Sequence, residues 1–117
     1  MEELFDDILS MEDVRGVMLF SFEGQLVFRK FLSPLSKKLE NNDWIPFVDS
    51  LKEVREADLV FQKSRVYIRE TDIGYLLILM GDFAPAATIR LSCDILLPSL
   101  KQIGTAKGFR RLFKKKK

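Results

Sequence analysis

The stretch of residues 59–81 limits most strongly what this chain can fold into, because it holds three strand-like segments with no room for a helix between them. These segments are residues 59–62, 65–69 and 75–80. Neighbouring parallel strands need a crossover of about a dozen residues or more, so connections this short require antiparallel pairing. Residues 75–80 are apolar at every position, which is typical of a central strand covered on both faces. The sequence therefore predicts an antiparallel meander.

A second pair of strand-like runs precedes this meander. Residues 17–22 are almost continuously apolar, residues 25–30 turn polar at their end, and Glu23-Gly24 lies between the two runs. This pattern predicts a β-hairpin in which Gly24 takes a positive φ, since glycine has no Cβ to oppose that conformation. We expect the first run to be a second central strand and the second run to be an outer strand.

Apolar residues at spacings of three and four predict three helices. The first covers residues 3–9. The second begins with Asn42 or Asp43 as its N-cap, and its apolar face consists of Trp44, Phe47, Val48, Leu51 and Val54. The last covers residues 85–103, and Pro98 is expected to kink or break it because proline removes a backbone hydrogen bond.

The order of elements is thus helix, two strands, helix, three strands, helix. Two strands that are apolar on both sides need cover on both faces of one sheet, and three helices can supply it. The predicted fold class is α+β, with a five-stranded antiparallel sheet and helices on both faces. We expect a single domain of residues 1–104, ended by Gly104, and a flexible basic tail of residues 105–117.

The sequence lacks the side chains on which many enzymes depend. It contains no histidine, a single cysteine, Cys93, and no glycine spacing that would cradle a phosphate. Cys93 lies on the apolar face of the last predicted helix, so we expect it to be a small buried hydrophobic residue. We therefore expect no catalytic residue, no metal site and no cofactor, in a protein that acts by binding and is not an enzyme.

Other polar and aromatic residues have a functional and a structural interpretation. Four carboxylates near the N-terminus could hold a metal ion: Asp6, Asp7, Glu12 and Asp13. No second polar group converges on them, which favours a solvated surface. Three arginines have no evident catalytic partner: Arg65, Arg69 and Arg90. Trp44 could anchor a partner protein, but its spacing favours packing on the sheet.

Four short motifs, in their order and spacing, carry a family resemblance. They are Val14-Arg15-Gly16-Val17, Phe22-Glu23-Gly24-Gln25, Arg65-Val66-Tyr67-Ile68-Arg69-Glu70 and Gly74-Tyr75-Leu76-Leu77-Ile78-Leu79. With the predicted element order, they resemble the Roadblock family, named after a dynein light chain, in its bacterial or archaeal members. The resemblance spans residues 3–103 and leaves out the tail. The chain departs from the family in having Glu23-Gly24 where Asp-Gly is common, and in the prolines at positions 34, 46 and 98.

The resemblance implies a profilin-like sheet with the strand order 2-1-5-4-3, and a homodimer formed by pairing of the third strand. The residues of that interface would be Leu59, Val60, Phe61 and Gln62. An apolar strand at a sheet edge is an aggregation hazard unless it is paired, which agrees with self-pairing. The resemblance also implies that the protein regulates or scaffolds a small Ras-like GTPase. We expect this partner to meet the outer side of the second helix, at Asp49, Lys52, Glu53 and Glu56.

The C-terminal tail differs sharply in charge from the rest of the chain. The net charge is +2, but residues 107–117 carry seven of the 19 basic residues and no acid, which leaves 12 basic against 17 acidic residues elsewhere, a net charge of −5. Apolar residues interleaved with the cations favour an anionic membrane surface, since the acidic domain would repel nucleic acid. A merely solvated tail is the other interpretation. The surface-binding residues would be Lys107, Phe109, Arg110, Arg111, Leu112, Phe113, Lys114, Lys115, Lys116 and Lys117.

Two other functions stay open at this point: a profilin-like sensor with a small-molecule pocket against the sheet, and an adaptor that binds a membrane or nucleic acid through the tail. The acidic N-terminus differs from a secretory signal, and no apolar run approaches the length of about 20 residues that crosses a bilayer. We therefore expect a soluble cytoplasmic protein that the tail could hold at the inner face of the membrane.

Overall fold

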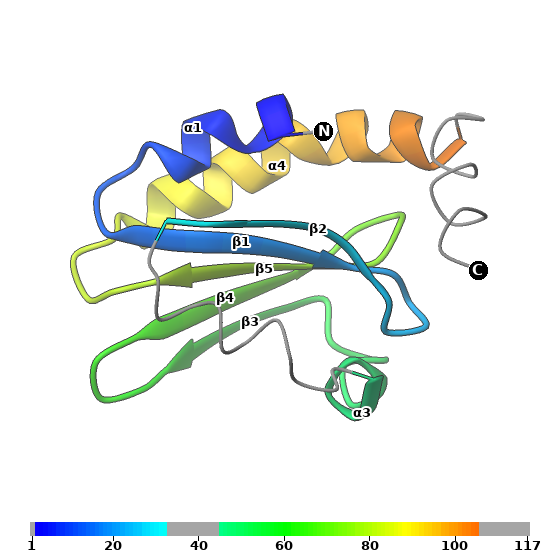
Figure 1. Ribbon diagram of the computed structural model, residues 1–117, viewed down its shortest axis with the longest axis horizontal. Helices are drawn as coiled ribbons and strands as arrows, with labels where there is room; N and C mark the ends of the chain where they lie inside the picture. Colours follow the sequence, from blue (N-terminus) through cyan, green and yellow to red (C-terminus); the bar gives the residue numbers. More distant parts are fainter. Residues whose placement is uncertain (1, 33–44, 106–117) are drawn as a thin grey trace.

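The computed structural model describes residues 2–32 and 45–105, which form a five-stranded sheet with helices packed on it (Figure 1). The strands are β1 (Val14–Phe20), β2 (Leu26–Phe31), β3 (Glu56–Val60), β4 (Arg65–Glu70) and β5 (Tyr75–Met80). The helices are η1 (Glu2–Phe5), a 3₁₀ turn that leads into α1 (Asp6–Leu9), then α3 (Ile45–Asp49) and α4 (Ala86–Thr105). The predicted α+β class is confirmed.

The strand order is β2-β1-β5-β4-β3, and every neighbouring pair is antiparallel. The order implied by the family resemblance is therefore confirmed. β5 has the predicted bounds of residues 75–80, and all six of its side chains are buried. β1 and β5 lie side by side at the centre of the sheet, which explains why both are apolar on each side.

One face of the sheet is covered by α1 and α4, which lie next to each other (Figure 1). This layer buries side chains of the N-terminal helical segment, the two central strands and α4: Phe5, Ile8, Val17, Leu19, Leu76, Ile78, Ile89, Cys93, Leu96 and Leu100. The ring of Phe5 stacks on that of Phe28 with centroids 5.1 Å apart. Cys93 is fully buried here, as predicted.

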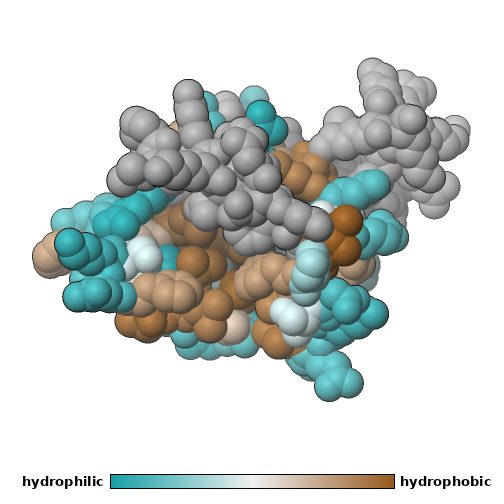
Figure 2. Space-filling model, turned by 60° about the horizontal axis from the view of Figure 1, so that its bottom comes forward, coloured by the Kyte–Doolittle hydropathy of each residue, from teal (hydrophilic) through white to brown (hydrophobic). Residues whose placement is uncertain are grey.

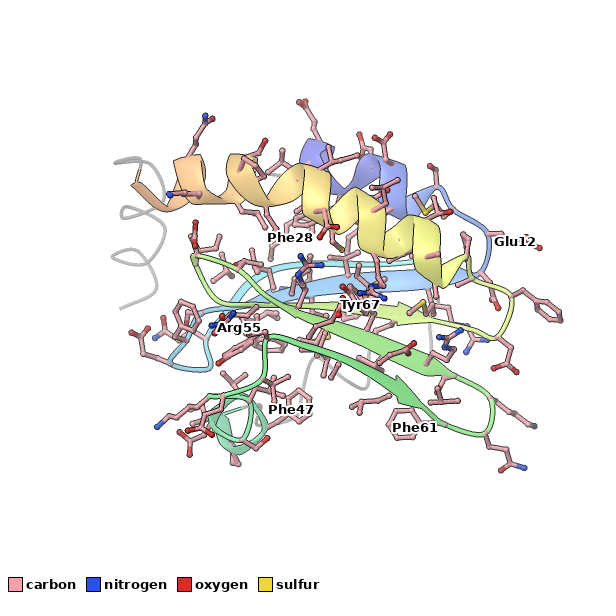
Figure 3. The ribbon with its side chains drawn as sticks, turned by 180° about the vertical axis from the view of Figure 1, so that it is seen from behind. Glu12, Phe28, Phe47, Arg55, Phe61 and Tyr67 are labelled. Carbon is pink, nitrogen blue, oxygen red and sulfur yellow. The ribbon has the colours of Figure 1, made fainter. Side chains whose placement is uncertain are left out.

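The opposite face carries α3 (Figures 1 and 3). Its core joins the alternate side chains of the strands to those of α3 and the turn that follows: Met18, Phe20, Val48, Leu51, Ile68, Tyr75, Leu77 and Leu79. Val66 packs against the same cluster as Ile68, so the predicted alternation of β4 is confirmed. Each layer thus uses one half of the period-two pattern of the strands.

The second helix is much shorter than predicted. Within the described residues it covers only Ile45–Asp49, while its expected start at residues 42–44, including Trp44, lies outside them. The Ser50 hydroxyl donates to the Phe47 carbonyl at 2.5 Å, and the Leu51 amide bonds to Val48 three residues back. Tight turns with i−3 hydrogen bonds therefore replace the helix, yet they keep Leu51 and Val54 on the sheet because a spacing of three is preserved.

The third strand begins earlier than predicted and ends earlier too. It covers Glu56–Val60, not residues 59–62, and the amide of Phe61 bonds to the carbonyl of Ser64 across the β3–β4 turn. Charged Glu56 and Asp58 alternate with Ala57 and Leu59, so the strand is polar on one side. The prediction failed because only the apolar part was assigned to the strand.

α4 runs without a break from Ala86 to Thr105, with Pro98 inside it. The expected break at Pro98 is wrong, and the helix continues past Gly104. Pro85 precedes the helix, and its carbonyl accepts the amide of Ile89 at 2.9 Å. Pro98 is exposed, while Leu96 and Leu100 are buried on either side of it, so α4 keeps its apolar packing on the sheet despite the lost hydrogen bond. Among the described helices, α4 included, none is both long and apolar enough for a membrane span.

The β1–β2 hairpin turns at Phe22-Glu23-Gly24, as predicted. Gly24 has φ +92°, and its amide donates to the Ser21 carbonyl at 3.0 Å. The buried Ser21 hydroxyl accepts the amide of Gln25 at 3.1 Å. The Ser21 side chain therefore stabilises the turn from its buried side.

Candidate interaction surfaces

β3 is the outermost strand of the described sheet and has only β4 as a strand neighbour. At the two ends of the β3–β4 ladder, the Phe61 amide bonds to the Ser64 carbonyl and the Glu70 amide bonds to the Arg55 carbonyl. Ala57 and Leu59, which pair with Ile68 and Val66, follow the same alternation between these ends. In an antiparallel ladder, alternate residues bond to the same neighbour. The backbone groups of Glu56, Asp58 and Val60 therefore point outward, away from β4.

This edge is also rich in exposed apolar side chains. Leu59 is 38% exposed, Val60 68% and Phe61 54%. On the neighbouring surface, Ile45 of α3 is 56% exposed. Viewed from the α3 side, apolar surface extends over much of this face of the molecule (Figure 2). We call Leu59, Val60 and Phe61, together with the outward backbone of β3, the edge surface. Gln62, the fourth residue of the predicted interface, is exposed in the β3–β4 turn.

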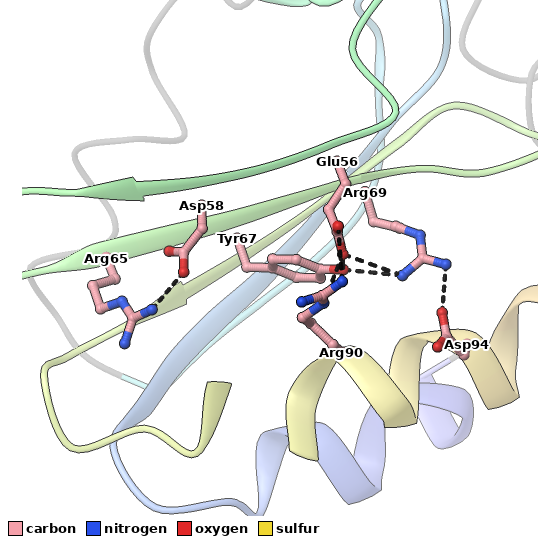
Figure 4. A network of polar contacts seen from close by, with 7 residues as sticks. All are labelled: Glu56, Asp58, Arg65, Tyr67, Arg69, Arg90 and Asp94. Carbon is pink, nitrogen blue, oxygen red and sulfur yellow. Dashed lines mark hydrogen bonds and ion pairs between the residues drawn. The ribbon is translucent and has the colours of Figure 1, made fainter. Parts of the chain in front are cut away.

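The predicted partner-binding residues do not share one surface. Asp49, Lys52 and Glu53 are exposed on α3 and the turn after it, and Lys52 Nζ lies 2.9 Å from a carboxylate oxygen of Asp49. This hydrogen bond and the charge of Asp49 raise the pKa of Lys52. The placement of Glu56 on the second helix is wrong, because Glu56 belongs to β3 and its side chain turns to the α4 side of the sheet (Figure 4).

Glu56 is the centre of a polar network between β3, β4 and α4 (Figure 4). Its two carboxylate oxygens accept from Arg90, with the Nε–Oε2 and Nη2–Oε1 distances 2.9 and 3.1 Å. The buried Tyr67 hydroxyl donates to the same carboxylate. Arg69 donates to the Tyr67 oxygen at 3.0 Å and to the carboxylate of Asp94. Since this arrangement joins an edge strand to α4, it stabilises the position of β3.

Each of the three arginines singled out in the sequence is engaged by a carboxylate. Arg69 and Arg90 belong to the network around Glu56, and Arg65 lies 2.5 Å from Asp58 on the neighbouring strand β3. These pairs use the guanidinium groups within the fold. A structural role for the arginines follows from this geometry.

Sequence reasoning missed Glu56 and Asp58 as partners of these arginines. The signal that could have found them is the alternation Glu56-Ala57-Asp58-Leu59, which has the period of a strand with one polar face. Arg65 and Arg69 then follow at matching positions of β4, directly opposite Val60 and Glu56.

The four N-terminal carboxylates are spread over α1 and the turn before β1. Asp13 has φ +59°, its backbone carbonyl accepts the amide of Gly81 at 2.9 Å, and its carboxylate accepts that of Phe83 at 3.0 Å. Arg15 lies 3.7 Å from Asp13. Asp13 therefore ties the start of β1 to the β5–α4 connection. Among the described residues no group of three or more potential ligands is close enough to hold a metal ion.

Two buried groups give the protein a sensitivity to alkaline pH. Burial, reinforced by the hydrogen bond to Glu56, raises the pKa of Tyr67 to about 12, and burial raises the pKa of the Cys93 thiol to about 12. Both groups are neutral when protonated, so folding favours the protonated forms. Their contribution to stability is complete below their unfolded pKa values and is lost as the pH rises toward the folded values.

We therefore expect the free energy of unfolding to fall as the pH rises from about 9 to about 11. Urea denaturation at several pH values in this window measures the fall. Cys93→Ala should flatten the first part of the curve and Tyr67→Phe the later part, whatever each substitution does to stability at neutral pH. A double variant with the same pH slope as the unmodified protein would show that other groups cause the loss.

A groove follows α4 on the side of β4 and the β4–β5 turn. Next to the network it is lined by Arg55, Glu70 and Leu97 together with Glu56, Arg69, Arg90 and Asp94. Toward the C-terminal half of α4 its lining changes to Thr71, Asp72, Pro98 and Lys101, with Glu70, Asp94 and Leu97 shared between the two parts. The rim of the groove thus carries charges of both signs next to the network and is mostly acidic toward the C-terminal half of α4.

The fold assignment is supported by similar solved structures and not by sequence matches. No protein-family model matches the chain, and no curated protein matches it by sequence. The structure is similar to a Roadblock/LC7 domain from Streptomyces avermitilis, with a TM-score of 0.63 and 19% identity over 91% of this chain and 95% of that one.

Two further similar structures are MglB proteins. The gliding protein MglB from Thermus thermophilus has a TM-score of 0.63 and 17% identity, over 88% of this chain and 87% of that one. A structure described as MglB with a tetrameric arrangement has a TM-score of 0.63 and 16% identity, over 88% and 86% of the two chains. At these identities the similarity establishes the fold.

Proposed function

Proceeding from the Roadblock/LC7 fold of this chain, we propose that it is a homodimeric, non-catalytic module that regulates or scaffolds a small Ras-like GTPase. Self-association is supported by the tetrameric arrangement of one MglB of the same fold. A role in a motility-type regulatory system is supported by the gliding protein among the similar structures.

The edge surface is the observation that carries this proposal. It combines outward backbone groups on β3 with exposed Leu59, Val60 and Phe61, and such an edge pairs readily with another strand. Pairing of β3 with β3 of a second copy would join the two sheets and bring the two copies of α3 toward the same side. Asp49, Lys52 and Glu53 would then form a continuous charged surface available to a protein partner.

A non-catalytic role agrees with the positions of the arginines. Arg65, Arg69 and Arg90 are bound by carboxylates of the chain itself, so inserting one of them into the active site of a GTPase would first require breaking these pairs. We propose that the chain acts on a GTPase by binding, and that the partner supplies the chemistry of hydrolysis.

Affinity capture from the native host, performed with GDP and with a non-hydrolysable GTP analogue, tests the proposal. We expect enrichment of a small GTPase, with a preference for one nucleotide state, and no GTP turnover by the purified chain alone. Turnover by the isolated chain would overturn the non-catalytic role. If no GTPase is captured but a small molecule raises the melting temperature, the chain is a sensor domain instead.

Charge reversal on the α3 surface should weaken binding of the captured GTPase. We expect Asp49→Lys combined with Glu53→Lys to raise the dissociation constant at least about tenfold, equivalent to about 1.4 kcal/mol. Both side chains are exposed, so the melting temperature should change little. Titration calorimetry measures the affinity.

The matched control is Glu3→Lys combined with Glu12→Lys, which changes the charge equally at exposed positions near α1, on the other face of the sheet. The control should bind like the unmodified protein. Equal weakening in both variants would mean that only net charge matters, and no weakening in either would move the GTPase site away from α3.

A further inference from the structure

We infer that the basic C-terminal segment, residues 106–117, docks on its own domain, in the part of the groove lined by Glu70, Asp72, Asp94, Leu97 and Pro98. We call this part the acidic groove. The inference concerns a contact within the chain and does not depend on the proposed GTPase partner.

The acidic groove has a fixed shape. Asp72 lies on the β4–β5 turn, in which the buried Thr71 hydroxyl donates to the Gly74 carbonyl at 2.9 Å and accepts the Gly74 amide at 3.1 Å. Asp94 is held by Arg69, which is itself bonded to Tyr67. A ligand would therefore meet carboxylates that are already positioned, at little cost in conformational entropy.

The groove carries acceptors that the domain leaves without a partner. No hydrogen bond or ion pair engages the side chain of Glu70 or Asp72 in the part of the chain that the structure describes. Pro98 has no N–H, so the backbone carbonyl of Asp94 lacks the donor that residue 98 would give it in a regular helix. Leu97 and the exposed Pro98 add an apolar strip between these acceptors.

The C-terminal segment has the complementary chemistry. It alternates cations with apolar residues: Arg110, Arg111 and Lys114–Lys117 with Phe109, Leu112 and Phe113. Guanidinium and ammonium groups donate to carboxylates and to free carbonyls, and guanidinium groups do so in a planar fork. The aromatic rings can cover Leu97 and Pro98. An acidic groove with an apolar strip therefore suits this segment better than it suits a purely charged ligand.

The length of the segment also suits this site. Thr105 ends α4, and the rise of an α-helix places Asp94 roughly 16 Å back along the axis. An extended chain covers about 3.3 Å per residue, so about five residues span this distance after a reversal. Gly108 permits a reversal close to the end of the helix. Residues 109–113 would then reach the acidic groove.

Paramagnetic relaxation enhancement in the full-length protein tests the contact. A nitroxide attached through Lys115→Cys labels that position alone, because Cys93 is fully buried and its thiol pKa is raised to about 12. We expect strong broadening of the backbone amide signals of residues 70–74 and of residues 97 and 99–101, and none at Lys63 and Ser64 in the β3–β4 turn, at the opposite end of β4. High salt should reduce the broadening.

Two acid variants decide whether the groove itself is responsible. Glu70→Gln combined with Asp72→Asn should abolish the broadening, whereas Glu12→Gln combined with Glu53→Gln, which removes equal charge elsewhere, should not. Absence of broadening in the unmodified protein, or an equal loss in both variants, would overturn the inference. Mixing spin-labelled chains with isotope-labelled chains tests for an exchanged contact, and broadening only in that mixture would overturn docking within one chain.

An anionic membrane is the competing ligand for the same cations. Because docking occupies the segment, the groove variant should co-sediment with phosphatidylserine vesicles several-fold more than the control variant. Equal co-sedimentation of the two variants would contradict docking in the acidic groove.

Discussion

Replacing Val60 and Phe61 together with lysine is expected to convert the proposed homodimer into a monomer. Both side chains are more than half exposed at the end of β3, so the isolated domain does not depend on them for its core. In the proposed dimer they lie at the join of two antiparallel strands. Four lysines would then replace four apolar side chains at the join, and burying cations there without partners costs several kcal/mol.

We expect the dissociation constant of the dimer to rise at least about 30-fold, equivalent to about 2 kcal/mol. Light scattering coupled to size exclusion, at protein concentrations in the tens of micromolar, measures the mass directly. The circular dichroism spectrum should be unchanged, which separates loss of the dimer from loss of the fold.

The matched control for this prediction is Phe83→Lys. Phe83 is 77% exposed in the connection between β5 and α4, away from the edge surface, so the control changes an exposed aromatic residue without touching β3. It should keep the dimer mass. A monomer mass for the unmodified protein would refute the dimer, and a dimeric lysine variant would place the interface elsewhere.

Replacing Gly74 with alanine is expected to be the most destabilising turn substitution in the described chain. Gly74 has φ +152°, a conformation that side-chain-bearing residues rarely adopt. A Cβ at this position would lie 1.7 Å from the backbone oxygen of Phe20 and 2.9 Å from the Cα of Ser21. These are backbone atoms of the central strand β1 and its extension, which cannot move aside as a flexible side chain could.

Strain and overpacking together should cost about 2–6 kcal/mol of unfolding free energy. For a domain of this size, this lowers the melting temperature by roughly 10 °C or more, if the variant folds at all. Calorimetry measures the shift, and the yield of soluble protein serves as a second measurement.

Asp72→Ala is the control for the Gly74 prediction, because it adds no atom in the same β4–β5 turn. Its side chain is exposed and makes no hydrogen bond within the described residues, so its effect should stay within about 0.5 kcal/mol. Similar losses in the two variants would mean that the turn relaxes around the new methyl group, contrary to the close approach of β1.

The same turn illustrates how far the sequence predicts the fold. The apolar run 75–80 has the bounds of β5, and the short connections on either side of β4 dictate antiparallel pairing without any tertiary information. Gly24 likewise adopts the positive φ expected of its place in a hairpin. These features follow from local rules of chain length, side-chain period and turn chemistry, which act within a few residues.

The residues of the candidate surfaces were harder to predict from the sequence than the strands. Placing Glu56 on a helix was wrong because spacings of three persist when helix gives way to tight turns, and the apolar pattern cannot distinguish the two. The carboxylate is satisfied by Tyr67 and Arg90, which lie 11 and 34 residues away along the chain. No pattern among neighbouring residues of the sequence indicates a partner that is so distant along the chain.

The sequence by itself determined the number and direction of the strands and the burial of the two central ones, because these depend on the period of apolar residues and on the length of the connections. The tertiary structure decided where the helix at Ile45 ends, which side of β3 is polar, and that acids from the β4–β5 turn and α4 share one groove. Those features depend on charged groups that find partners across the sheet. Such pairings involve long-range contacts between separate elements, and they form only once the strands have brought those elements together.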